Sequence, residues 1–139
     1  MKAGYSILDH PADMGIEACA ATIEEAFEQA AEALISIILD PSRIECEESR
    51  EVTIDAIDIE HLLVKWLSEI LYLYDGERFV VGRFHVDELN DTHLKARLLG
   101  EKFFPSKHST KLDVKAITYH QLQIDRGHDG VRVRVFLDI

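Results

Sequence analysis

The chain has 139 residues, 47% of them hydrophobic, and a formal net charge of −11 at pH 7. This length and composition predict a single domain spanning residues 1–139, with enough apolar surface to build a core. The longest apolar runs are too short to cross a bilayer and no signal-peptide layout is present, so we expect a cytoplasmic protein with no membrane association. The acidity argues against direct contact with nucleic acid; it fits a hard cation, a basic protein partner or solubility alone. Cys19 and Cys46 are too few and too isolated for a disulfide framework, and we expect buried free thiols.

The first half of the chain predicts a mixture of strands and helices. Thr22 and Glu25 have the spacing of a capping box, and Asp58 is a good N-cap. Apolar residues then recur at helical period behind each cap, until Asp40-Pro41-Ser42 and Asp75-Gly76 stop the helices. The expected elements are strands over 4–10 and 15–20, a helix over 22–38, one strand or two within 44–57, and a helix over 58–74.

The second half predicts strands only. They are expected over 79–86, 94–99, 114–124 and 131–139. Within 114–124 the alternation places Val114, Ala116, Thr118, Leu122 and Ile124 on one face. Within 131–139 it places Val131, Val133, Val135, Leu137 and Ile139 on one face and Phe136 on the other. Two helices that do not alternate regularly with about seven strands predict an α+β fold, a two-layer sandwich of two helices packed on a mixed, mostly antiparallel sheet.

The candidate site begins in the sequence Leu8-Asp9-His10-Pro11-Ala12-Asp13-Met14-Gly15. Pro11 fixes its own φ and Gly15 can adopt φ values that other residues avoid, so we expect a shaped polar loop between two strands. By itself this segment is typical of an ordinary turn. At the other end of the chain, Asp138 lies one residue from the carboxylate of Ile139. If the two ends meet, oxygen ligands from Asp13, Asp138 and Ile139 would suit Ca²⁺ or Mg²⁺.

Other sources of chemistry are few. The sequence has no Gly-rich phosphate loop, no HExxH motif, no EF-hand loop and no G-x-S-x-G elbow. The segment from Lys102 to Lys115 is locally basic; it could contact phosphate or an acidic partner, or be a solvated loop. Trp66 and the stripe containing Phe27 are expected to pack in the core. Two other classes stay open: a metal-dependent hydrolase with His10 as base and Asp13 as ligand, and a chaperone-like interaction module.

Taken together, these stretches resemble the archease family over nearly the whole chain. The matching segments are 8–15, Thr22 to Phe27, Leu62 to Tyr72, Gly100-Glu101, Lys107-His108, Val114 to His120 and Leu137-Asp138-Ile139. One departure is Gly130-Val131, where many relatives open the last strand with an aromatic residue. The resemblance implies an accessory factor for an RtcB-type RNA ligase, which joins tRNA halves. Such a factor promotes guanylylation of the ligase and its multiple turnover without catalysing ligation.

The resemblance also implies roles for particular residues. Asp13, Asp138 and Ile139 match the family's cation site, with Ca²⁺ the usual ion and Mg²⁺ or another divalent cation as alternatives. Lys107 matches the lysine of the family's Lys-His pair and is expected to face the ligase, together with Asp9 and His10. We expect contact with tRNA to be only indirect, and the protein to be a monomer or a weak oligomer.

Overall fold

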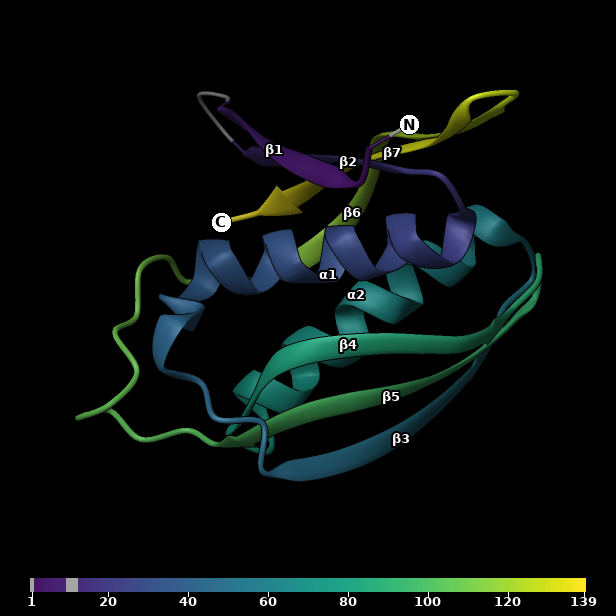
Figure 1. Cartoon of the computed structure of the whole chain (residues 1–139). Coiled ribbons are helices and arrows are strands. Elements are labelled where there is room, and N and C mark those ends of the chain that lie inside the picture. Colours follow the sequence, from purple (N-terminus) through teal and green to yellow (C-terminus); the bar gives the residue numbers. More distant parts are fainter. Residues whose placement is uncertain (1, 10–12) are drawn as a thin grey trace.

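The computed structural model describes residues 2–9 and 13–139 (Figure 1). In chain order the elements are β1 (Gly4–Asp9), β2 (Met14–Ala20), α1 (Ile23–Ile38), a short 3₁₀ turn (Pro41–Arg43), β3 (Glu48–Asp55), α2 (Ile59–Asp75), β4 (Phe79–Leu89), β5 (His93–Lys102), β6 (Ala116–Gly127) and β7 (Gly130–Asp138). None of the helices in the described part of the chain is long and apolar enough to cross a membrane.

The strands form two antiparallel sheets, with the orders β1-β2-β7-β6 and β3-β5-β4. Both helices lie in a layer between them (Figure 1), where α1 packs on β2 and β4 and α2 packs on β6 and β4. The α+β class with two helices against antiparallel sheets is therefore confirmed, but the strands divide between two sheets instead of forming one mixed sheet. The reason lies in the helices, since α1 is buried on more than one side and therefore packs against both sheets. Its buried residues are too many for one narrow stripe: Ala26, Phe27, Ala30, Ala31, Ala33, Leu34, Ile35, Ile37 and Ile38.

The helix boundaries follow the predicted caps. The hydroxyl of Thr22 accepts a hydrogen bond from the backbone N–H of Glu25 at 3.2 Å, and the carboxylate of Asp58 accepts one from His61 at 2.8 Å. At the far end of α2 the N–H of Gly76 donates to the carbonyl of Tyr72 at 2.7 Å. Since caps satisfy N–H groups that have no partner within the helix, these local signals locate both helices correctly.

Trp66 lies at the centre of the helix layer with no exposed surface. Its indole N–H donates to the carbonyl of Phe27 on α1 at 2.9 Å, and its ring meets Phe84 of β4 edge to face, with centroids 6.2 Å apart. The predicted packing roles of Trp66 and Phe27 are confirmed. Cys19 and Cys46 are free, as expected, although each is only half-buried.

Of the one or two strands expected within 44–57, the structure has one, β3, which begins inside the polar stretch 47–51 because charged side chains there face solvent. Two other strands are longer than predicted. β4 runs to Leu89, beyond the expected end at residue 86, so the connection between β4 and β5 is 90–92. β5 runs beyond the expected end at residue 99, because Glu101 and Lys102 still belong to it.

The prediction of which β6 residues face the core is wrong at the start of the strand. Ile117 is buried and Ala116 is exposed, the reverse of the expected alternation. Between the pairs Thr118↔Phe136 and Gln123↔Arg134, β6 advances five residues while β7 advances two, and Gln121 has a φ of 52°. An odd number of inserted residues moves the following side chains to the opposite face, which a period-2 pattern cannot reveal.

The turn between β6 and β7 is short, and Gly130, which opens β7, has a φ of 144°. Residues with a side chain rarely adopt this conformation, so the turn requires a glycine at this position.

Candidate functional site

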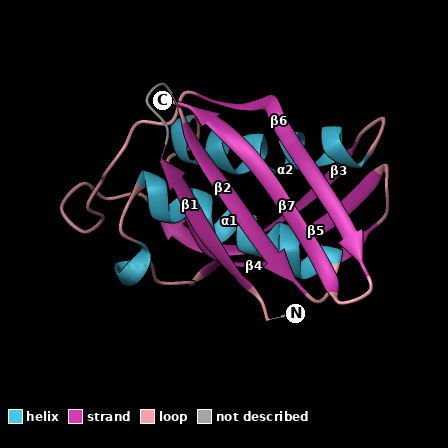
Figure 2. Cartoon of the chain, turned by 90° about the horizontal axis from the view of Figure 1, so that it is seen from above, coloured by secondary structure: helices cyan, strands magenta, loops and turns pink. Residues whose placement is uncertain are grey.

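The two ends of the chain lie side by side in the four-stranded sheet. β2 and β7 pair antiparallel from Ala20↔Val131 to Met14↔Leu137, so Asp13 precedes the last pair on one strand and Asp138 follows it on the other. Figure 2 shows the C-terminus at the end of the sheet where β2 begins. The carbonyl of Asp138 accepts a hydrogen bond from Lys115 at 2.8 Å, which attaches the end of β7 to the start of β6. The juxtaposition that a site shared by Asp13 and Asp138 requires is therefore present; cation binding there stays a prediction.

The side chains at this end of the sheet differ in exposure. Asp13 is half-buried, and its Oδ1 atom is inaccessible to solvent. Asp138 is exposed, and Ile139 keeps 37% of its surface exposed. The two carboxylates therefore differ in setting, one partly enclosed by protein and one reachable from solvent.

Gly15 allows β2 and β7 to approach at this point. A Cβ atom there would lie 2.8 Å from the ring of Phe136 and 3.0 Å from the Cβ of Leu8. Gly15 does not have a positive φ, so the expectation that it adopts backbone angles other residues avoid is wrong. Its role is steric, because the Phe136 side chain, on the face of β7 away from the valines, is buried against it.

The other predicted residues of this segment are only partly described. Asp9 ends β1, where it pairs with Met14, but its side chain lies outside the described part of the structure. His10 and Pro11 also lie outside the described residues. Their predicted roles stay predictions.

Lys107 is held by carboxylates of the protein itself. Its ammonium group lies 2.8 and 2.9 Å from the two carboxylate oxygens of Glu101 and 3.3 Å from Glu45, and its side chain is 22% exposed. The hydrogen bond to Glu101 raises the pKa of Lys107, so the side chain stays charged. The predicted ligase-facing lysine thus has an internal partner and presents only part of its surface.

Glu101 is a buried carboxylate with three donors. Besides Lys107, it accepts hydrogen bonds from the backbone N–H of Glu45 at 2.9 Å and from Nε2 of His108 at 2.8 Å. Nδ1 of the buried His108 accepts from the N–H of Phe104 at 3.0 Å, so its Nε2 must carry the proton. Burial alone would raise the pKa of Glu101, but the hydrogen bonds outweigh burial and lower it to about 2.

A second lysine of the basic segment is also tied to the protein. Lys111 donates from its backbone N–H to the carbonyl of Ile38 at 2.8 Å and from its side chain to the carbonyl of Ser36 at 3.2 Å, both at the end of α1. Both hydrogen bonds satisfy carbonyls at the end of α1 that lack partners within the helix, and the ammonium group also interacts favourably with the helix dipole. The segment is therefore anchored, and neither Lys107 nor Lys111 is a freely solvated charge.

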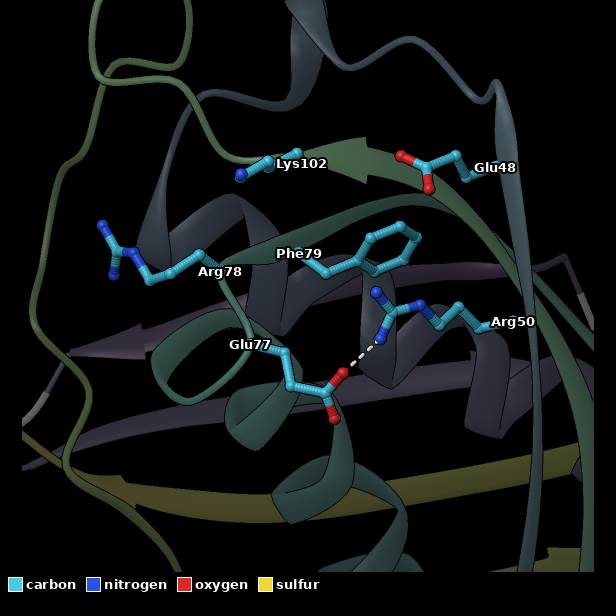
Figure 3. Close-up of a pocket in the computed structure, with 6 residues that line it drawn as sticks. All are labelled: Glu48, Arg50, Glu77, Arg78, Phe79 and Lys102. Carbon is cyan, nitrogen blue, oxygen red and sulfur yellow. Dashed lines mark hydrogen bonds and ion pairs between the residues drawn. The ribbon is translucent and has the colours of Figure 1, made fainter.

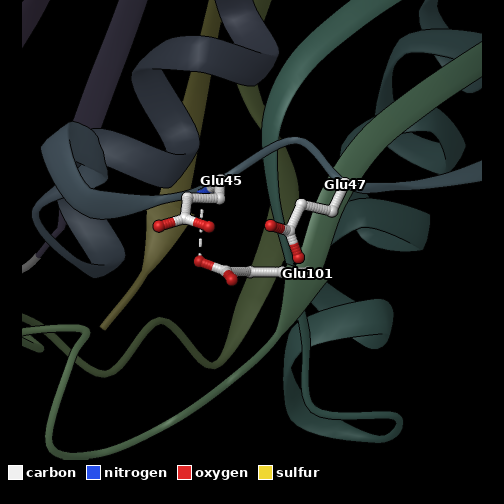
Figure 4. Close-up of side chains that lie close together, drawn as sticks. All are labelled: Glu45, Glu47 and Glu101. Carbon is white, nitrogen blue, oxygen red and sulfur yellow. Dashed lines mark hydrogen bonds between the residues drawn. The ribbon is translucent and has the colours of Figure 1, made fainter.

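An acidic cluster was missed by the sequence interpretation. One carboxylate oxygen from each of Glu45, Glu47 and Glu101 lies within 4.8 Å of the others (Figure 4). The pKa of Glu47 is raised by a hydrogen bond to the side chain of Glu45 and by the negative charge of Glu45. The two-residue spacing of Glu45 and Glu47 could have suggested a shared side of an extended segment, but nothing local connects them to Glu101. Oxygen groups in this arrangement could hold a divalent cation, in competition with the Lys107 ammonium group.

Comparison with known proteins places the chain in one family. The profile described as the archease protein family (MTH1598/TM1083) matches residues 5–139. The archease of Methanosarcina mazei is 38% identical over 139 residues, covering 97% of this chain and 95% of the relative. That of Sulfurisphaera tokodaii is 42% identical over 137 residues, covering 97% and 98%.

Solved structures agree with this assignment. The solution structure of Methanobacterium thermoautotrophicum protein 1598 superimposes with a TM-score of 0.80 at 32% identity, covering 98% of this chain and 99% of the other. A crystal structure of an archease from Thermotoga maritima, described as a possible chaperone, has the same fold at 20% identity, covering 95% and 94%, with a TM-score of 0.61. The resemblance seen in the sequence is confirmed, and the chain belongs to the archease family.

Proposed function

We propose that this protein is a non-enzymatic activator of an RtcB-type RNA ligase in tRNA splicing, promoting guanylylation of the ligase and its multiple turnover. Membership of the archease family supports this partner. The observation that carries the proposal is the pairing of β2 with β7, which brings Asp13 and Asp138 to the same end of one sheet. A function shared between the two ends of the chain requires this arrangement.

The donor set at this end of the sheet fits a hard divalent cation. Asp13, Asp138 and the carboxylate of Ile139 supply only anionic oxygen atoms, which suit Ca²⁺ and also Mg²⁺. A bound cation would lower the electrostatic cost of bringing phosphates together during nucleotidyl transfer. The protein's own contribution is to hold these oxygens at one place, with Gly15 and Phe136 keeping the two backbones close.

The surface that meets the ligase would include Asp9, His10 and the exposed part of Lys107. A net charge of −11 suits docking on a basic RNA-binding enzyme, with contact to tRNA only through that enzyme. The protein would act in the cytoplasm as a monomer or a weak oligomer.

A ligation assay with the cognate ligase, GTP and cleaved tRNA tests the proposal. Addition of the wild-type protein should stimulate ligation, and Asp13→Ala or Asp138→Ala should abolish the stimulation without changing the circular dichroism spectrum. Asp129→Ala, which removes a carboxylate from the opposite end of β7, is the matched control and should stimulate like the wild type. Full stimulation by both site variants would contradict the proposal, as would turnover of phosphodiesters by the isolated protein.

A calcium titration locates the cation. Binding measured by calorimetry should be lost in Asp13→Ala and retained in Glu47→Gln, which alters the acidic cluster of Glu45, Glu47 and Glu101. The reverse result would move the cation to that cluster and overturn the site proposed for the chain ends.

A further inference from the structure

A hollow of about 260 Å³ lies at one end of the β3-β5-β4 sheet, which does not contain the chain ends (Figure 3). It is lined by Glu48 and Arg50 of β3, Glu77 and Arg78 between α2 and β4, Phe79 of β4 and Lys102 of β5. Three of these six side chains are basic, in a chain with 15 basic and 26 acidic residues. The hollow is thus a local concentration of positive charge that the proposed function does not use.

Arg50 and Lys102 approach the hollow from different strands. In Figure 3 the Arg50 side chain lies against the ring of Phe79, with its guanidinium carbon 4.3 Å from the ring centroid, and pairs with Glu77. Lys102 lies on the other side of Phe79, where β5 ends. Because a guanidinium group has five N–H donors, pairing with one carboxylate leaves Arg50 further donors for a second anion.

The charges of Arg78 and Lys102 are not neutralised by close carboxylates. Among the described residues, no acidic oxygen lies within 4.0 Å of the side-chain nitrogen atoms of Arg78 or Lys102. Of the two carboxylates that line the hollow, Glu77 pairs with Arg50, and Glu48 lies across the hollow from Arg78. The guanidinium group of Arg78 instead packs over the ring of Phe103 at 4.4 Å and of Tyr74 at 5.1 Å. Aromatic faces hold a cation in place while leaving its charge intact.

The backbone of Arg78 adds a second observation. Its φ is 54°, a left-handed conformation that is costly for a long side chain and usual for glycine. The carbonyl of Arg78 accepts a hydrogen bond from Phe103 at 2.7 Å, which holds this conformation at the rim of the hollow. The backbone of Arg78 is thus fixed at the rim of the hollow.

We propose that this hollow binds the phosphate group of a small anion. Lys102 and Arg50 are the contacting donors, and Arg78 contributes positive potential from the rim. Since the Arg50–Glu77 pair is neutral overall, the six lining side chains carry a net positive charge, with Arg78 and Lys102 against Glu48. Asp75, which does not line the hollow, interacts electrostatically with Arg78, so Lys102 is the main free charge. Phosphate suits it because its several oxygens can accept at once from an ammonium group and from the free edge of a guanidinium group.

Amide chemical shifts of the full chain during titration with sodium pyrophosphate, at constant ionic strength and without divalent cations, test the proposal. Saturable shifts should concentrate at residues 48–50, 77–79 and 102. Lys102→Met should weaken binding at least fivefold. Lys95→Met, which removes the same charge from an exposed position on the same strand, should leave affinity within twofold.

A variant with the opposite sign excludes a general loss of structure. Glu48→Gln removes the carboxylate facing the two cations and should tighten pyrophosphate binding two- to fivefold. Parallel titrations with inorganic phosphate and with GTP separate a free anion from the phosphate end of a nucleotide as its source. Shifts that are absent, spread over the surface, or changed equally by Lys102→Met and Lys95→Met would overturn the proposal. These results do not depend on ligase stimulation, which the chain-end variants test separately.

Discussion

At the scale of single residues, Glu101 organises more of the polar structure than any motif in the sequence suggested. Its carboxylate accepts from Lys107, His108 and the backbone of Glu45, and so joins the end of β5 to the segment 103–115 and to the segment before β3. A buried charge is tolerated only when it is paired and hydrogen-bonded. Lys107 is therefore first a structural partner of Glu101, and any contact with the ligase uses the exposed remainder of its side chain.

Glu101 should make stability depend on pH in the acid range. Its folded pKa of about 2 lies below the ordinary value of 4.5, so its contribution is fully present above about pH 5 and is lost as pH falls towards 2. Glu101→Gln should lower the free energy of unfolding by about 2 kcal/mol at pH 7, because an amide cannot replace the charge facing Lys107. Urea denaturation at pH 7, 4 and 3 should show this difference shrinking as pH falls. Exposed Glu51→Gln is the control; a difference for Glu101→Gln that is constant with pH would contradict the assignment.

At the scale of elements, a side chain of α1 closes the open edge of β4. The carboxylate of Glu28 accepts a hydrogen bond from the backbone N–H of Val86 at 2.7 Å, next to the register shift between Val86 and Glu88. β4 is an edge strand, and an unpaired N–H there would otherwise be open to another chain. Burial raises the pKa of Glu28, and burial together with the charge of Glu28 raises that of Glu32 one turn later.

Glu28→Gln should stabilise the protein at neutral pH. A raised folded pKa means that ionised Glu28 costs stability above that pKa and nothing below its ordinary value of 4.5. The amide oxygen can still accept from Val86, so we expect a gain of about 0.5 kcal/mol, kept small by solvent screening. Urea midpoints at pH 7 and pH 4 measure it. The gain should vanish at pH 4, and a loss of stability at pH 7 would show that the charge itself holds the strand edge.

At the scale of the whole molecule, the two helices form a layer that both sheets share (Figure 1). Trp66 is buried in this layer and contacts α1 through the carbonyl of Phe27 and the three-stranded sheet through Phe84. Neither sheet can bury its apolar face without the helices. We therefore expect residues 1–139 to unfold as one cooperative unit.

Two probes measure this cooperativity. The fluorescence of Trp66, which is the protein's one tryptophan, and far-ultraviolet circular dichroism should give coincident urea transitions. Trp66→Phe should lower the free energy of unfolding by about 3 kcal/mol, since it leaves a cavity and removes a hydrogen bond. The dichroism transition of this variant should stay single. Two separated transitions in the wild type would indicate two independent units.

The sequence by itself determined what depends on neighbouring residues. Helix caps at Thr22 and Asp58, helical periodicity behind them and the order of seven strands all follow from local hydrogen bonding and from which side chains avoid water. The motif around Asp13 and the final Leu137-Asp138-Ile139 were also visible, and with other segments they indicated the family correctly.

Only the tertiary structure decided which strands pair and which side chains meet. Alternation along a strand does not say which sheet it joins, so the division into two sheets around the helices was missed. The inserted residues near Gln121 also put Leu122 and Ile124 out of phase with Ile117, which no period-2 pattern reveals. The same limit applies to the sites. Asp13 and Asp138 come to the same end of one sheet through the pairing of β2 with β7, and Glu45 contacts Glu101 across 56 residues of chain. The physical reason is that sequence spacing governs contacts within an element, whereas contacts between elements depend on how buried faces pack together.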